Sequence, residues 1–137
     1  MKILVATEKP FAPVAIRLIR EITDAAGYEL ALLENYKDVS EFHMAVADAD
    51  ALIVRSDIVD EAVLKAAGKL KIVVRAGAGY DNLDLAACTA HNVVAMNTPG
   101  QNANAVAELA FEMMLYQARQ GFGGKSGSEL RGKTIGL

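Results

Sequence analysis

Residues 51–79 read ALIVRSDIVDEAVLKAAGKLKIVVRAGAG and contain two short apolar runs, Ala51–Arg55 and Leu70–Arg75. The runs are continuous rather than alternating, which is typical of parallel strands that are covered by helices on both faces. Between them, Asp60 is placed to cap a helix that ends near Gly68. This stretch therefore predicts a strand, a helix and a second strand parallel to the first.

The same alternation continues in both directions along the chain. Four further apolar runs of this kind are Lys2–Thr7, Tyr28–Leu33, Val93–Asn97 and Lys133–Leu137. The helices between them carry start and stop signals. Gly27 ends the first helix, and Asp38 begins the next with Glu41 three residues later, an Asp-based capping box. Asp84 is placed to cap another helix that ends near Asn92. This order implies right-handed crossovers and predicts an α/β fold with an open, doubly wound parallel sheet of flavodoxin-like or Rossmann-like type.

Length and composition limit the class of protein. The chain has 137 residues, of which 53% are hydrophobic and 23% charged, and its formal net charge is −3. These values predict a globular domain with room for part of another, and no overall basic field that would attract nucleic acid or an anionic membrane. The lone Cys88 cannot form an internal disulfide, no metal-ligand spacing of Cys and His occurs, and a reducing cytoplasm is expected. No apolar run approaches the roughly 20 residues of a membrane helix.

The segment 102–120 differs from the other helical segments because it has little polar surface. A helix of this kind needs apolar cover all round, so we expect one of its faces to pack against a second domain or subunit. Residues 121–128, GFGGKSGS, have the composition of a flexible linker.

Candidate binding residues follow the strands, because ligands of an open α/β sheet bind beyond the carboxyl ends of its strands. Arg55 and Ser56 follow one strand, and Arg75 leads into the Gly-Ala-Gly loop at 77–79. Two guanidinium groups and the successive N–H groups of a glycine loop suit a small anion such as a carboxylate or phosphate. Asn102, at the start of the long helix, is a further candidate.

Each feature also has a structural interpretation that the sequence leaves open. The glycines could be turn residues only, and the arginines could pair with Asp57 and Asp81 at the surface. Asn102 or Asn104 could only cap a helix, and Glu108 is either solvent-facing or a buried carboxylate with a partner. The convergence of several such features on one sheet edge favours an anion site.

Other catalytic and nucleotide motifs are absent from the sequence. A GxGxxG fingerprint that starts at Gly77 would need glycine at position 82, where the chain has Asn82, and no GxxxxGK[ST] loop occurs. His43 and His91 have no Ser or Cys nucleophile motif nearby, and nothing next to Cys88 in the sequence would lower its pKa. We interpret these three residues as structural.

Four segments resemble a known family: RAGAGYDNLD at 75–84, NTP at 97–99, NANAVAE at 102–108 and LRGKTIG at 130–136. At this mutual spacing the chain is similar, over essentially its whole length, to the D-2-hydroxyacid dehydrogenases, and most similar to their phosphoglycerate branch. The family implies a two-domain homodimeric enzyme that uses NAD at the 2-position of a small anionic hydroxy or keto acid. The resemblance implies a substrate-binding domain over 1–100, an interdomain helix over 101–120, and, over 121–137, a linker and the first strand of a truncated nucleotide-binding domain.

The resemblance also implies residue roles. Substrate binding falls on six residues: the backbone amides of Ala78 and Gly79, the side chains of Arg55, Ser56 and Arg75, and Asn102 at the cleft. Ala78 is also the implied NAD contact, through its backbone alone, where similar enzymes often have threonine. The catalytic Arg, Glu and His of the family lie beyond Leu137. The resemblance therefore implies no catalytic residue and no metal here, a chain that is inactive alone, and a complete enzyme that oxidises 3-phosphoglycerate to 3-phosphohydroxypyruvate in serine biosynthesis.

Three other functions are alternatives. The chain could belong to a dehydrogenase of the glycerate, lactate or glyoxylate type, or be a free-standing anion-binding module. The bare apolar helix and the severed last strand disfavour the module. A response-regulator-like domain would need an acidic cluster that Glu8, Asp57 and Asp81 do not form.

Overall fold

The computed structural model describes residues 1–136, which divide into two compact units, 1–99 and 100–136. The elements of the first unit are, in order, β1 (Lys2–Thr7), α1 (Pro13–Ala25), β2 (Glu29–Glu34), α2 (Val39–Val46), β3 (Ala51–Val54), α3 (Glu61–Ala66), β4 (Ile72–Arg75), α4 (Leu85–Ala90) and β5 (Val94–Asn97). The second unit contains α5 (Ala103–Ala118) and the 3-10 helix η1 (Gln120–Phe122). The predicted strands up to residue 97 are confirmed, with ends that differ by one or two residues.

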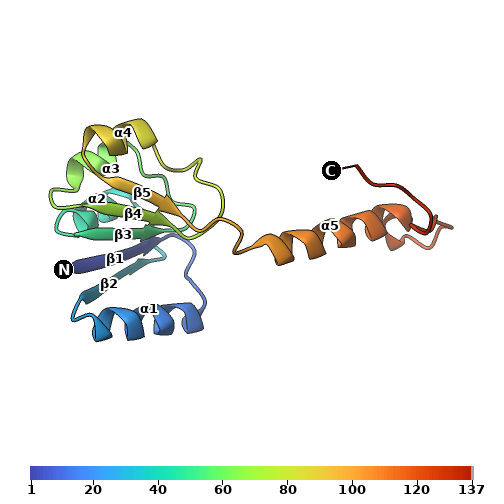
Figure 1. The fold of residues 1–137 in the computed structure, drawn as a ribbon, viewed down its shortest axis with the longest axis horizontal. Helices are drawn as coiled ribbons and strands as arrows, with labels where there is room; N and C mark the ends of the chain where they lie inside the picture. The colour runs from blue at the N-terminus through green and yellow to red at the C-terminus, as the bar shows by residue number, and fades with distance from the viewer. Residues whose placement is uncertain (137) are drawn as a thin grey trace. The chain divides into compact units, whose positions relative to one another are not determined.

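The five strands form one parallel sheet in the order β2-β1-β3-β4-β5. Figure 1 shows α1 on one side of the sheet and α3 and α4 on the other. The predicted doubly wound α/β fold is therefore confirmed, and the strand order is that of the flavodoxin type. In this order the chain turns in opposite directions after β1 and after β3, so the carboxyl ends of these two neighbouring strands mark the switch point where such sheets bind ligands.

The core lies on the face of the sheet that carries α2, α3 and α4. Leu4 pairs in register with Leu52, and Leu52 with Val73, and all three side chains are buried against these helices. On the edge strand β5 the side chains of Val94 and Met96 remain 57% and 51% exposed. Apolar burial, which is the main stabilising term, is therefore concentrated on one face of the sheet.

The predicted helix signals are confirmed at residue level. Asp38 accepts a hydrogen bond from the N–H of Ser40 at 2.8 Å, while its own N–H donates to Oε1 of Glu41 at 3.1 Å, which completes the capping box. The bond from Ser40 holds the pKa of Asp38 below its usual value. The side chains of Asp60 and Asp84 cap α3 and α4 by accepting backbone N–H groups, without the reciprocal bond of a capping box. Local sequence therefore sets the start of each of these helices.

The strand predicted at Lys133–Leu137 is wrong for residues 133–136, which form no strand, and Leu137 lies outside the described residues. A strand is stable when its N–H and C=O groups pair with a neighbour, and positions 100–136 contain no strand that could provide one. The long apolar helix is present as α5, and none of its side chains is buried. Among residues 1–136 no helix combines the length and apolar character needed to cross a membrane.

Candidate functional site

The two arginines meet at the carboxyl ends of β3 and β4. Val54 pairs in register with Arg75, and Nε of Arg75 donates a hydrogen bond to the carbonyl oxygen of Arg55 at 2.9 Å. Within residues 1–136 neither guanidinium forms an ion pair, so the alternative that they pair with Asp57 and Asp81 is not observed. Both positive charges are therefore available to an anion at this edge.

Gly77 allows the Arg75 side chain to lie across the loop that follows β4. A Cβ atom at position 77 would lie 2.6 Å from Cζ of Arg75, too close for any real contact. A Cβ atom at Gly79 would meet Oδ1 of Asp81 at 3.1 Å and Nη1 of Arg75 at 3.6 Å. Glycine at position 77 therefore leaves the space that the Arg75 guanidinium group occupies, and a side chain at this position would displace that group.

The carbonyl groups of the glycine loop are tied to the end of β5. The N–H of Thr98 donates to the carbonyl oxygen of Gly77 at 2.9 Å, and Nδ2 of Asn97 donates to that of Ala78 at 2.7 Å. In the described part of the chain, the N–H groups of Ala78 and Gly79 donate no hydrogen bond. A loop fixed through its carbonyl groups, with two unpaired N–H groups, has the donors that an anion requires.

The other predicted substrate residues are placed differently. Ser56 directly follows Arg55 and is exposed at the same sheet edge. Asn102 belongs to the second unit, at the N-cap position of α5, and its side chain makes no capping hydrogen bond. The structure thus brings five of the six predicted residues to one edge, and a substrate contact by Asn102 stays a prediction.

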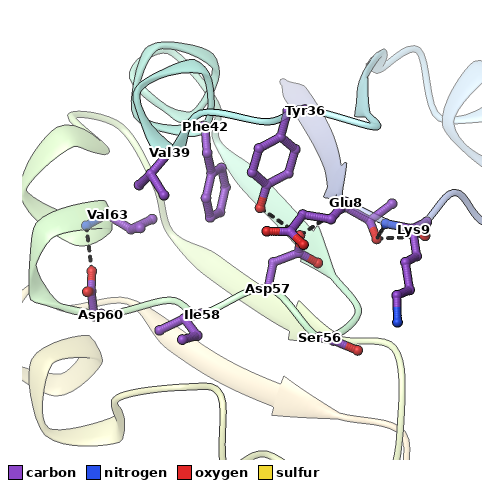
Figure 2. A pocket seen from close by; sticks show the side chains of 11 residues that line it. Glu8, Lys9, Tyr36, Val39, Phe42, Ser56, Asp57, Ile58, Asp60 and Val63 are labelled. Atoms are coloured by element: carbon purple, nitrogen blue, oxygen red, sulfur yellow. Dashed lines mark hydrogen bonds between the residues drawn. The ribbon is translucent and has the colours of Figure 1, made fainter.

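A cavity of about 360 Å³ lies beside this edge, at the switch point between the ends of β1 and β3. In Figure 2 its apolar lining (Val39, Phe42, Ile58, Val63) faces the acidic side chains of Glu8 and Asp57, and Ser56 lies at its margin. The cavity therefore adjoins the arginine site through the segment 55–57.

Tyr36 and Asp57 form a buried pair in the wall of this cavity. The Tyr36 hydroxyl donates to Oδ1 of Asp57 at 2.6 Å, and the N–H of Glu8 donates to the same oxygen at 2.9 Å. Burial, and then the hydrogen bond to Asp57, raises the pKa of Tyr36 well above its usual range, so the hydroxyl remains a donor. The sequence suggests for Asp57 only a pairing with an arginine or a place in an acidic cluster, and it gives no signal for Tyr36, because the two lie 21 residues apart.

The pH dependence of stability should reveal this pair. Because the pKa of Tyr36 is raised in the folded protein, the unfolded chain loses this proton first, at a pH of about 10. The stability linked to this group is complete below about pH 10 and is lost as the pH rises above it. We expect the free energy of unfolding to fall more between about pH 8 and about pH 11 in the unsubstituted protein than in Tyr36→Phe, as measured by urea unfolding. Equal decreases in the two proteins would contradict this assignment.

The remaining polar candidates have structural surroundings. Cys88 is buried, and burial raises the pKa of its thiol. Nε2 of His91 lies 3.2 Å from Oε2 of Glu61. Glu108 is exposed, so of its two interpretations the structure favours the solvent-facing side chain over the buried carboxylate. No group of three His, Cys, Asp or Glu side chains among residues 1–136 comes together as a metal site would require. The arginine edge is therefore the site with the clearest chemistry.

Comparison with known proteins identifies the family of this chain. Residues 3–130 match the family model described as D-isomer specific 2-hydroxyacid dehydrogenase, catalytic domain. The D-3-phosphoglycerate dehydrogenase of Mycobacterium leprae is 42% identical over 114 residues, which cover 73% of this chain and 22% of that protein. The Sus scrofa protein of the same name is 38% identical over 132 residues, with coverages of 86% and 25%.

A solved structure extends the likeness to three dimensions. The NAD⁺-bound 3-phosphoglycerate dehydrogenase of Entamoeba histolytica is 53% identical, with a TM-score of 0.91, and the match covers 95% of this chain and 43% of that one. The chain thus spans less than half the length of each of these relatives. Because the family model matches most of the sequence, and the fold agrees with that of a relative, the chain belongs to the D-isomer specific 2-hydroxyacid dehydrogenase family.

Proposed function

We propose that this chain is the substrate-binding part of an NAD-dependent enzyme that oxidises 3-phosphoglycerate to 3-phosphohydroxypyruvate. The observation that carries the proposal is the pair of guanidinium groups, Arg55 and Arg75, beside the unpaired N–H groups of Ala78 and Gly79. The substrate has a carboxylate and a phosphate, which match two separate sets of donors. The names of the relatives from Mycobacterium leprae and Entamoeba histolytica support the same substrate.

Each set of donors suits one end of the substrate. We assign the carboxylate to the N–H groups of Ala78 and Gly79, because successive backbone N–H groups form a compact anion nest. We assign the phosphate to the guanidinium groups of Arg55 and Arg75, with the Ser56 hydroxyl as a further donor. Hydrogen bonds from guanidinium to phosphate are charge-assisted and frequently bidentate, so they fix orientation as well as affinity. The substrate would thus be held at both ends.

NAD would accept the hydride in the complete enzyme. Residues 77–82 do not form a dinucleotide-binding loop, since Asn82 stands where the third glycine is needed. Ala78 is the one residue that we propose to contact NAD, through its backbone, because a methyl group donates no hydrogen bond. The chain by itself is therefore proposed to bind substrate without oxidising it.

The domain assignment and the cellular setting are parts of the same proposal. We propose a substrate-binding domain over 1–100, an interdomain helix over 101–120 that carries Asn102 to the cleft, and a linker with the start of a nucleotide-binding domain over 121–137. The separation of the described residues into two compact units at Pro99 supports the first boundary. We further propose that the complete enzyme is a cytoplasmic homodimer that serves serine biosynthesis.

Calorimetric titration of the 137-residue chain tests the function. We expect 3-phosphoglycerate to bind on the order of tenfold more tightly than D-glycerate or inorganic phosphate, because only the first ligand engages both donor sets. Equal affinity for D-glycerate would instead favour a dehydrogenase of unphosphorylated acids. Absence of binding by all three ligands would reject the anion site itself.

A further inference from the structure

We propose that Asp57 is a positioning residue for the anion site, a role that rests on the function proposed above. Asp57 is only 7% exposed and is not assigned to the substrate. It ends the short segment 55–57, which carries Arg55 and Ser56 to the sheet edge. A buried carboxylate is costly unless its oxygens are hydrogen-bonded, so the partners of Asp57 indicate what it holds in place.

The carboxylate ties this segment to two other parts of the fold. Its Oδ1 atom accepts hydrogen bonds from the hydroxyl of Tyr36 at 2.6 Å and from the N–H of Glu8 at 2.9 Å. Its Oδ2 atom accepts the N–H of Arg55 at 3.4 Å. Figure 2 shows the Tyr36 and Glu8 bonds converging on Asp57 at the wall of the cavity. The end of β3 is thereby joined to the end of β1 and to the segment that precedes α2.

The backbone of the same segment is also tied to residues on either side of the glycine loop. Nδ2 of Asn82 donates to the carbonyl oxygen of Asp57 at 2.7 Å, and Nε of Arg75 donates to that of Arg55 at 2.9 Å. The segment is therefore held on both sides. A shift of its backbone would move Arg55 directly and would move the Arg75 guanidinium through the Arg55 carbonyl.

Replacement of Asp57 by asparagine separates positioning from simple electrostatics, because the two predict opposite signs. If Asp57 acted only as a negative charge near an anion site, its neutralisation would tighten anion binding. Asparagine, however, has one acceptor oxygen and an NH₂ group in place of the second. It must leave at least one of the donors from Tyr36, Glu8 or Arg55 unpaired, which would release the segment and weaken binding.

The test measures the dissociation constant of 3-phosphoglycerate for the 137-residue chain by calorimetry. We expect Asp57→Asn to bind about tenfold more weakly. The matched control is Thr23→Val in α1, which also removes a hydrogen bond of a buried residue, from Oγ1 of Thr23 to the carbonyl oxygen of Arg20 at 3.0 Å. We expect this control to lower the melting temperature and leave the dissociation constant unchanged. Without ligand, the amide proton signals of Glu8 and Arg55 should shift in Asp57→Asn and stay in place in Thr23→Val.

Four results would overturn the inference. Equal or tighter binding by Asp57→Asn excludes positioning, and so does a loss of affinity in Thr23→Val as large as that in Asp57→Asn. If Asp57→Asn does not fold, the milder variant Tyr36→Phe takes its place, and we expect it to bind 3-phosphoglycerate about threefold more weakly. An unchanged dissociation constant in this folded variant would also exclude positioning. Failure of the unsubstituted chain to bind 3-phosphoglycerate rejects the proposed function, and this inference with it. If the unsubstituted chain binds 3-phosphoglycerate and the variants bind it with the same dissociation constant, the inference is rejected and the proposed function is retained.

Discussion

Replacement of Arg75 by alanine is expected to weaken the binding of 3-phosphoglycerate about 100-fold while changing that of D-glycerate much less. A hydrogen bond to a charged group contributes roughly 1.5–3 kcal/mol, and two such bonds from a bidentate guanidinium, taken at the lower value, contribute about 3 kcal/mol, or about 100-fold. The substitution also removes the donor to the Arg55 carbonyl, so Arg55 loses one of its restraints. Calorimetric titration of the variant with both ligands measures the difference. In a complete enzyme, the same loss should raise the Michaelis constant for the phosphorylated substrate.

Two companion variants sharpen this measurement. Arg20→Ala removes an equal charge from the exposed face of α1, and we expect it to leave both affinities unchanged. Gly77→Ala places a methyl group where the Arg75 guanidinium lies, and the flexible end of Arg75 yields more easily than the backbone. It should therefore lose much of the affinity for 3-phosphoglycerate with little loss of stability. Similar losses for both ligands in Arg75→Ala would remove this residue from phosphate recognition.

The largest expected effect on stability is that of Leu52→Ala. Leu52 is fully buried in the middle of the sheet between Leu4 and Val73, so its truncation removes apolar contacts and leaves a cavity. We expect a loss of about 3 kcal/mol in the free energy of unfolding. Met96→Ala on β5 is the control, because its side chain is 51% exposed, and we expect a loss of less than about 1 kcal/mol. Urea unfolding of both variants measures these values, and equal losses would contradict the one-sided core.

Sequence patterns predicted most of the fold because the determinants are local. A continuous apolar run is typical of a strand in a parallel sheet, and an Asp at a helix start accepts N–H groups within three residues of itself. The strand at Lys133–Leu137 was predicted from the same kind of run and is wrong for residues 133–136. Its composition suits a strand, but a strand also needs a neighbour, which composition cannot reveal.

The candidate site shows where sequence reasoning stops. Strand order brings Arg55 and Arg75 to one edge, and this could be predicted because the ends of parallel strands lie together. The bond between Tyr36 and Asp57 joins a residue before α2 to one after β3, and the printed sequence contains no pattern that links them. The position of the Arg75 guanidinium across Gly77 depends on a rotamer, which only a three-dimensional structure provides.

The carboxylate contact that we propose for the N–H groups of residues 78 and 79 has a consequence for how this site would evolve and how it must be probed. Every residue except proline has a main-chain N–H donor, so other substitutions at Ala78 would alter the surface offered to a neighbouring molecule and preserve the proposed anion contact. An alanine scan would pass over this half of the site entirely. Only exchange of the amide for an ester linkage at these two positions would delete the donors while leaving every side chain in place.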